Sequence, residues 1–130
     1  MGPVGAGVTT KLCNNLISIT THALLAEAMV LGAKAGIDGQ RLYETLRASS
    51  ARSNTLERVV PKHFLPRNFE AAASIATIMK DLGCAIDLGR AMGVDLTLAE
   101  AAMLCYEQAR DIAAVILPIE EKAGVKVGGS

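Results

Sequence analysis

A long apolar stretch near the start of the chain, from Leu16 to Ala35, is the feature that most constrains the fold. Spanning a membrane takes about 20 consecutive, predominantly apolar residues. Polar and charged residues interrupt this stretch well before that length, namely Thr20, Thr21, His22, Glu27 and Lys34. We therefore expect a long helix in a protein core, and we expect no membrane partner.

The rest of the chain is also rich in helix-forming residues. Alanine, leucine and glutamate are frequent, aromatic residues make up only 3% of the sequence, and no segment alternates apolar with polar residues at period two. These features predict an all-α fold, a helical bundle of about five helices with one long N-terminal helix.

Caps, glycines and prolines predict the helix boundaries. The first three helices are expected from about Val8 to Ala35 before Gly36, from the N-cap Asp38 to near Ser49, and from about Asn54 to just before Pro61. The fourth is expected from Asn68 or Glu70 to Gly93, and the fifth from a Thr97–Glu100 capping box to Pro118. The chain then divides into a helical domain over 1–117 and a flexible tail over 118–130, whose GGS end resembles a remnant of cloning.

Charge and cysteine content exclude several classes of function. Lysine plus arginine and aspartate plus glutamate number 13 each, which argues against nucleic acid and anionic lipid as partners. Cys13, Cys84 and Cys105 have no CxxC spacing, so they indicate neither a disulfide framework nor a metal site. We expect buried thiols in a reducing compartment. Since no secretory signal pattern opens the sequence, we expect a cytoplasmic protein.

The segment GPVGAGVTTKLCNNL, residues 2–16, combines glycines with a lysine and two asparagines. On a helix, one stripe contains Lys11, Asn15, Ser18 and His22, and a neighbouring stripe suited to packing contains Leu12, Leu16, Ile19 and Ala23. Glycines before the helix, Gly7 among them, would let the backbone approach a ligand. The residues alone leave two interpretations open: a ligand-binding face, or a flexible leader followed by a solvated lysine and a capping amide.

A resemblance to a known family favours the first interpretation. The spacing Gly2-x-x-Gly5-x-Gly7-x-x-x-Lys11-x-x-x-Asn15 resembles the catalytic segment of the β-hydroxyacid dehydrogenases, the family of 3-hydroxyisobutyrate dehydrogenase and tartronate semialdehyde reductase, with 6-phosphogluconate dehydrogenase as a related enzyme. The similarity continues to about Gln108 through AEAM at 26–29, KAGID at 34–38, SSARS at 49–53, KDLGCA at 80–85 and GVDLTL at 93–98. Several motifs in order make this a specific resemblance.

The resemblance implies a fold and a function. The chain is similar to the all-helical C-terminal domain of such an enzyme, which closes a cleft over an NAD- or NADP-binding Rossmann domain in the same parent protein. It implies a small 2- or 3-hydroxy acid as substrate and NAD or NADP as cofactor. Because the apolar first helix would stay partly wet in a monomer, we also expect a homodimer or higher homo-oligomer.

The resemblance also implies roles for individual residues. Lys11 is the expected proton-transfer group, and since lysine has a reference pKa of about 10.4, such a base needs a desolvated cleft or a nearby cation. Asn15, Gly7 and Asp81 are expected at the substrate, with Asp81 either contacting it or holding Lys80. Lys80 is expected on the cofactor side. No metal is expected.

The chain departs from the family pattern at Ala73, where many relatives carry phenylalanine, and in its C-terminal segment AAVILPIEEKAG. Substrate identity is therefore left open. An alternative from another class is a helical domain used only for self-association, in which the stripe with Lys11 and Asn15 is a solvated face.

Overall fold

The computed structural model describes residues 3–69, 75–109 and 113–128. Within these ranges the fold is all-α, with no strand, as the sequence predicts. The elements in chain order are α1 (Pro3–Lys34), α2 (Gly39–Arg47), α3 (Asn54–Val59), a π-helical turn η1 (Val60–Phe64), α4 (Ile75–Met92), α5 (Thr97–Glu107), a 3₁₀ turn η2 (Ala113–Val115) and α6 (Ile116–Ala123).

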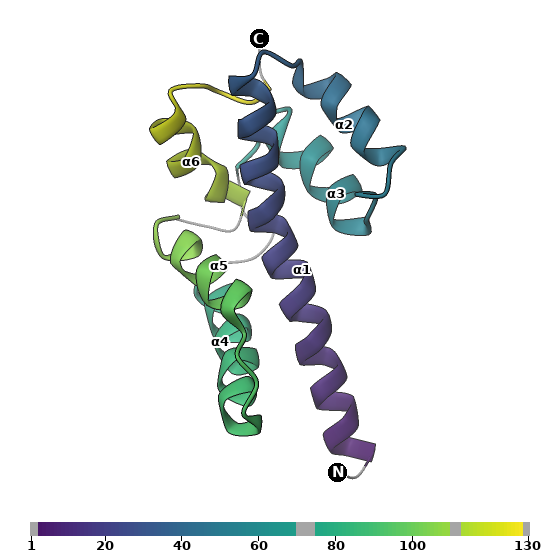
Figure 1. The fold of residues 1–130 in the computed structure, drawn as a ribbon, viewed down its shortest axis with the longest axis vertical. Coiled ribbons are helices and arrows are strands. Elements are labelled where there is room, and N and C mark those ends of the chain that lie inside the picture. Colours follow the sequence, from purple (N-terminus) through teal and green to yellow (C-terminus); the bar gives the residue numbers. More distant parts are fainter. Residues whose placement is uncertain (1–2, 70–74, 110–112, 129–130) are drawn as a thin grey trace.

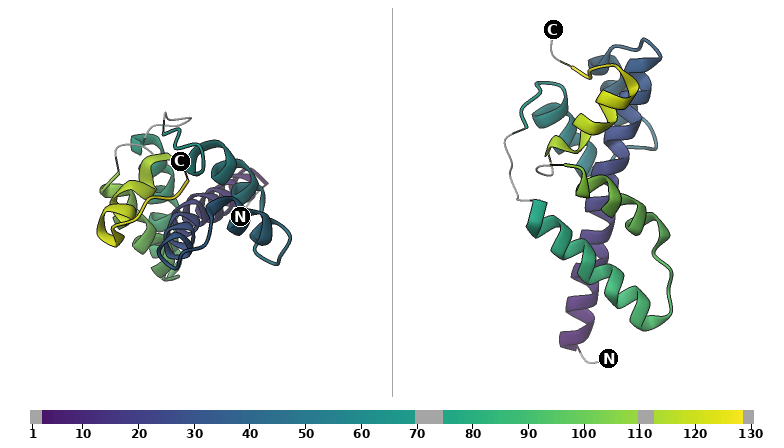
Figure 2. Two further views of the ribbon diagram at one scale, coloured as in Figure 1. Left: turned by 90° about the horizontal axis from the view of Figure 1, so that it is seen from above. Right: turned by 90° about the vertical axis from the view of Figure 1, so that its left-hand side faces the viewer.

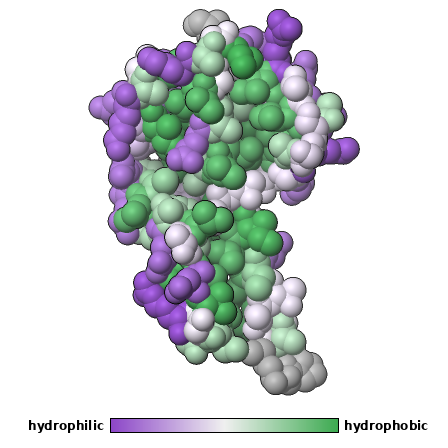
Figure 3. All heavy atoms as spheres, viewed as in Figure 1, coloured by the Kyte–Doolittle hydropathy of each residue, from purple (hydrophilic) through white to green (hydrophobic). Residues whose placement is uncertain are grey.

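The long helix α1 is the axis around which the other helices pack (Figure 1). Helices α2, α3 and α6 surround its C-terminal half, whereas α4 runs antiparallel beside its N-terminal half (Figures 1 and 2). The two ends of the chain lie at opposite ends of the molecule (Figure 1). On the face seen in Figure 1, apolar residues reach the surface in the middle and hydrophilic residues concentrate at the edges (Figure 3).

The core is built on the middle and C-terminal part of α1. Its buried side chains include Ile19, Ala26, Met29 and Val30, the last three at 3% exposure or less. By length and composition α1 is apolar enough to cross a membrane, but 44% of its most apolar window is buried inside the protein. This burial agrees with the expectation of a core helix.

Local signals correctly predict the ends of α1 and α4 and the start of α2. Gly36 and Gly93, which follow the two helices, have φ of 90° and 74°, a left-handed conformation that costs glycine little. The carboxylate of Asp38 accepts a hydrogen bond from the N–H of Arg41 at 3.2 Å, as an N-cap should.

The start of α1 differs from the prediction. The helix begins at Pro3 instead of near Val8, so Gly5 and Gly7 are helical and do not form a flexible leader. Proline suits the first turn, and a helix that is already nucleated extends through glycine at a cost of about 1 kcal/mol each. Gly2 lies outside the described residues.

Pro61 does not end the third helix. After α3, which Ser53 caps by accepting from the N–H of Leu56 at 3.0 Å, the chain continues into η1 with Pro61 in its first turn. The wider π-helical turn closes with a hydrogen bond from the N–H of Leu65 to the carbonyl of Val60. Proline has no N–H to lose there, so a change of helix type replaces the expected break.

Of the two remaining helix starts, the fourth is tested only in part and the fifth differs from the prediction. Asn68 is not helical and Glu70 lies outside the described residues, as does Ala73; the described part of α4 begins at Ile75. The expected capping box at α5 is wrong, because Leu96 is the N-cap and makes no side-chain capping bond. Glu100 instead accepts a hydrogen bond from Arg90 at 2.7 Å.

The C-terminal segment 118–130 is not a flexible tail in the part that the structure describes. Pro118 lies in the first turn of α6 and does not end a helix, and Val127 is only 1% exposed. Gly124, with φ of 71°, ends α6 and turns the chain back. The boundary expected at residue 117 therefore falls inside α6, and residues up to 128 belong to the domain.

An ion pair between buried Glu120 and partly buried Arg67 holds this segment in place. The guanidinium of Arg67 donates to both carboxylate oxygens of Glu120 at 2.8 Å and to the carbonyl of Val127 at 2.7 Å. The N–H of Val127 donates to the same carboxylate at 2.6 Å. The hydrogen bond to Glu120 raises the pKa of Arg67 further above its usual range. The ion pair thus joins the segment after η1, which carries Arg67, to α6 and the residues that follow it.

We predict that Glu120→Ala destabilises the domain by about 3 kcal/mol, because it removes the carboxylate that pairs with the Arg67 guanidinium and leaves the Val127 N–H without its acceptor. Urea unfolding would measure the change. A matched control is Glu100→Ala, which breaks the exposed pair with Arg90 and should cost less than about 1 kcal/mol. Equal losses in the two variants would contradict the structural importance of the buried pair.

Candidate functional site

The N-terminal half of α1 carries the polar stripe expected from the sequence. Along this stripe Lys11 is exposed, Asn15 and Ser18 are half-buried, and His22 is buried at 4% exposure. The stripe therefore runs from solvent into the core. Only its outer part, with Lys11 and Asn15 one helical turn apart, can reach a ligand.

The neighbouring apolar stripe packs as predicted. Leu12 and Leu16 are half-buried, and Ile19 and Ala23 are 5% and 4% exposed. Leu16 packs against the core cluster that Ile19 and Ala23 join. The packing stripe fixes the rotation of α1 about its axis and so determines which way the Lys11 stripe faces.

Gly7 is an exposed helical residue near the start of this face. A Cβ added at Gly7 would meet no atom of the described chain within 4 Å. The space beside this turn is open, so any requirement for glycine here would have to come from a ligand or another domain.

The second pair of candidate residues lies on α4. Its buried side chains include Ile78, Leu82 and Ile86. Lys80 is exposed, and Asp81 is half-buried beside Leu82 at the edge of that buried face. Because α4 makes its most extensive contact with α1, the two candidate pairs lie on neighbouring antiparallel helices (Figures 1 and 2).

The functional groups of these residues are available for a ligand. Among the described residues, no hydrogen bond or ion pair engages the side chains of Lys11, Lys80 or Asp81. An ammonium and an amide on α1 can donate to a hydroxyl or a carboxylate, and a second ammonium on α4 adds positive charge. This donor set suits a small anionic substrate.

Both histidines interact with neighbouring residues of the fold. His22 makes edge-on ring contacts with Phe64 at 5.6 Å and with Tyr106 at 6.4 Å between centroids. His63 Nδ1 lies 2.9 Å from the carbonyl oxygen of Asn68. Both rings therefore interact with other parts of the fold.

The cysteines are less buried than expected. Cys13 and Cys84 are exposed and Cys105 is half-buried, which corrects the expectation of buried thiols. Burial raises the pKa of the Cys105 thiol, and the carboxylate of Glu27 raises it further. Cys105 is therefore protonated at neutral pH and is a weak nucleophile. Within the described ranges, no group of three or more histidine, cysteine or acidic side chains is arranged to hold a metal ion.

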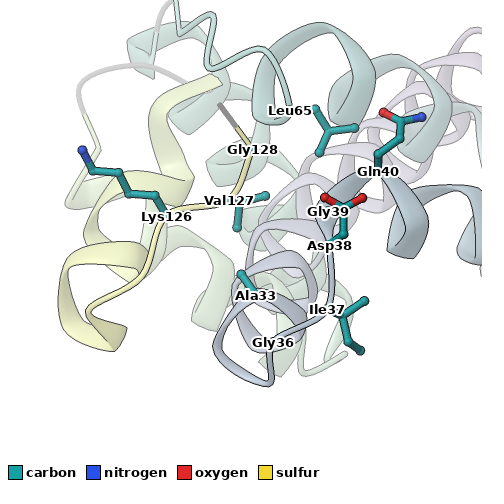
Figure 4. Close-up of a pocket in the computed structure, with 10 residues that line it drawn as sticks. All are labelled: Ala33, Gly36, Ile37, Asp38, Gly39, Gln40, Leu65, Lys126, Val127 and Gly128. Atoms are coloured by element: carbon teal, nitrogen blue, oxygen red, sulfur yellow. The ribbon is translucent and has the colours of Figure 1, made fainter. Parts of the chain in front are cut away.

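Two of the surface hollows in the described part of the chain lie between elements that are distant in sequence, and no candidate residue lines either of them. One, of about 530 Å³, lies between the α1–α2 turn and the C-terminal segment, where Lys126 points away from Asp38 (Figure 4). The other, of about 490 Å³, is largely apolar and is lined from α1 by Ile17, Thr20 and Leu24 and from α5 by Leu98, among others. No sequence pattern indicates this second hollow, because it depends on which helices meet.

The chain is similar in sequence to known dehydrogenases. Residues 5–115 match a family described as the NAD-binding part of NADP-dependent 3-hydroxyisobutyrate dehydrogenase. A 2-(hydroxymethyl)glutarate dehydrogenase of Eubacterium barkeri is 34% identical over 99% of this chain and 45% of its own length. An L-threonate dehydrogenase of Cupriavidus necator is 35% identical over 75% of this chain and 33% of its own length.

Solved structures give the same result. A 3-hydroxyisobutyrate dehydrogenase from Salmonella typhimurium superposes with a TM-score of 0.81 and 29% identity, over 88% of this chain and 42% of that one. The Mycobacterium tuberculosis 3-hydroxyisobutyrate dehydrogenase, determined with L-serine, gives a TM-score of 0.79 and 28% identity, over 88% and 44%. The chain thus spans less than half the length of each of these relatives.

Proposed function

The chain belongs to the 3-hydroxyisobutyrate dehydrogenase family, and on that basis we propose that it forms the helical catalytic part of an NAD(P)-dependent oxidoreductase acting on a small 2- or 3-hydroxy acid. One observation carries the proposal. Lys11 and Asn15 lie one turn apart on the part of α1 that projects beyond the core, beside the helix that carries Lys80 and Asp81. All four lie within the family match, residues 5–115.

Lys11 is proposed as the group that exchanges a proton with the substrate oxygen. Oxidation of a hydroxy acid removes a proton from the hydroxyl as well as a hydride from the carbon, so a base must lie within hydrogen-bond reach. In the reverse direction the Lys11 ammonium donates to the carbonyl oxygen. The side chain is exposed and has no carboxylate partner among the described residues, so it is available for this role.

Asn15, Gly7 and Asp81 are proposed as the substrate-binding residues. The Asn15 amide orients the substrate without adding charge, and Gly7 leaves room for it beside the helix. Asp81, at the edge of the buried face of α4, either contacts the substrate or orients Lys80.

The family description agrees with NAD or NADP as cofactor. The exposed ammonium of Lys80 suits a dinucleotide phosphate or ribose and is proposed to contact it. When bound, the cofactor would accept or return the hydride. Most of its contacts are proposed to come from a Rossmann domain of the same parent protein, since the relatives are more than twice as long as this chain.

The alternative, a helical domain used only for self-association, also has an observation in its favour. Ile17, Leu24 and Leu31 are 59% to 72% exposed and repeat every seven residues along α1. Two copies of α1 that cross antiparallel about Leu24 would bring Ile17 of each copy against Leu31 of the other, which is the self-complementary geometry of a two-fold dimer. Self-association and catalysis are compatible, so we propose a homodimer for the enzyme as well.

We predict that Lys11→Ala in the complete enzyme lowers turnover about 10²- to 10⁴-fold while cofactor affinity stays nearly unchanged. Steady-state kinetics with separate cofactor titration measure both. Lys34→Ala, at an exposed lysine in the last turn of the same helix, is the matched control and should retain normal turnover.

Two further variants sharpen this test. Lys11→Arg should rescue little, because a guanidinium stays protonated and cannot act as the base. Asn15→Ala should raise the Michaelis constant for the hydroxy acid more than it lowers turnover, since it removes orientation and not the proton acceptor. Near-normal turnover of Lys11→Ala would contradict proton transfer by Lys11 and would favour the alternative, in which the stripe is a solvated face.

We predict that residues 1–130 alone bind NADH with a dissociation constant of about 1 mM or weaker, because Lys80 and its neighbours supply only a few of the contacts that a dinucleotide needs. Fluorescence titration measures the affinity, with the complete enzyme as the positive control. Tight, saturable binding by residues 1–130 would contradict the proposed division of the cofactor site.

We predict that the protein sediments as a dimer at tens of micromolar, where interfaces of standard size persist. Leu24→Arg should shift it to monomer, because it places two like charges opposite each other at the centre of the pairing. Leu104→Arg, at a leucine on α5 that is 61% exposed, is the control and should leave the dimer intact. A monodisperse monomer in the unmutated protein would exclude this interface.

A further inference from the structure

Tyr106, on α5, forms a hydrogen bond with the backbone of α1. The side chain is fully buried, and its hydroxyl donates to the carbonyl of Ile19 at 2.5 Å. Burial strongly raises the pKa of Tyr106, and the nearby backbone of Ala23 opposes that rise. The hydroxyl of Tyr106 thus joins α5 to the turn of α1 that begins at Ile19.

A hydroxyl that donates to a helix carbonyl shares this acceptor with the helical N–H, and side chains at the hydrogen-bond ladder are a known cause of a bend. In Figure 1 the ribbon of α1 changes direction near its middle, so that the N-terminal half leans away from the line of the C-terminal half. The rings of His22 and Phe64 flank the same turn, with centroids 5.6 Å apart. The bend is therefore held inside the core.

The N-terminal half of α1 is held by α4, which runs beside it (Figure 1), and by half-buried side chains. From Gly5 to Ser18 no described side chain is buried, and Ile19 is the first that is. Contacts on this half are made by half-buried side chains such as Leu12 and Leu16. The turn that Tyr106 contacts is thus the last buried turn before the helix leaves the core, and it shares with α4 the control of the direction of the N-terminal half.

A small change of direction there has a large effect at the candidate site. Lys11 lies ten residues before the middle of the Ile19–Ala23 turn, which at about 1.5 Å per residue is about 15 Å along the axis. A change of about 10° would then move Lys11 by about 2.5 Å. Displacements of about 1 Å at a reacting group can cost about a hundredfold in rate.

We propose that Tyr106 is a positioning residue, whose hydroxyl sets the direction of the N-terminal half of α1 and thereby places Lys11 and Asn15 against the substrate. This inference rests on the function proposed above. Tyr106 itself touches neither substrate nor cofactor, because it is fully buried beneath α1.

The test is Tyr106→Phe in the complete enzyme. This variant removes only the hydroxyl and keeps the ring in the core. Ile19 and Ala23 both lie within the continuous helix α1, so the Ile19 carbonyl has a helical donor without the hydroxyl and the variant should fold. We expect turnover to fall at least tenfold and the Michaelis constant for the hydroxy acid to rise, with that for NAD(P) unchanged within about twofold.

Tyr43→Phe is the matched control. Tyr43 is the other tyrosine, it is 7% exposed on α2, and its hydroxyl makes no hydrogen bond within the described part of the chain. A purely structural role of Tyr106 would lower the melting temperature and leave the kinetic constants of the folded enzyme like those of Tyr43→Phe. That result would overturn the proposal, as would equal rises in the Michaelis constants for substrate and cofactor.

Lys11→Ala, assayed in parallel, separates the two proposals. If Lys11→Ala loses turnover and Tyr106→Phe does not, only the positioning role of Tyr106 fails. If Lys11→Ala retains turnover, the proposed function fails, whatever the Tyr106 variant does.

Discussion

Burial of the middle and C-terminal part of α1 is the interaction on which the rest of this structure depends. Ile19, Ala26, Met29 and Val30 lie under the other helices, and full burial of a side chain the size of isoleucine or methionine stabilises by about 1.5 to 3 kcal/mol. One helix thus serves as the shared wall of the whole core. Its remaining turns project beyond that core, where their polar groups stay accessible.

That division explains how one element can serve both stability and chemistry. The apolar stripe of α1 fixes the rotation of the helix, and the adjacent stripe passes from buried His22 to exposed Lys11. An ammonium on the projecting turns can be approached by substrate and by a second domain without disturbing the packing. The helix α4 supplies a second wall, and its Lys80 and Asp81 lie outside the residues that hold the core together.

Much of the fold could be predicted because its signals are local. Gly36, Gly93 and Asp38 act through the conformation or hydrogen bonding of their own neighbours, and each was found where the sequence indicated. The C-terminal segment could not be predicted in this way. Its order depends on Arg67 and Glu120, which are 53 residues apart. No pattern near either residue indicates that they meet.

The candidate site shows the same limit. Helical spacing correctly predicted the two stripes of α1, and the resemblance to a family supplied the roles of Lys11 and Asn15. Neither could indicate that Tyr106 reaches α1, because that contact joins residues 87 apart in sequence. The glycines before Lys11 led to a wrong prediction of the helix start, near Val8. The helix in fact begins at Pro3 and extends through Gly5 and Gly7.

The most direct measurement is a crystal structure of the complete enzyme with its dinucleotide and an unreactive hydroxy-acid analogue. We expect the Nζ atom of Lys11 within about 3 Å of the substrate oxygen that would exchange a proton, the reach that proton transfer requires. The amide of Asn15 should contact the same ligand. A ligand bound in the cleft with the Lys11 ammonium still in solvent, more than one water molecule away from that oxygen, would contradict the proposed role of this helix.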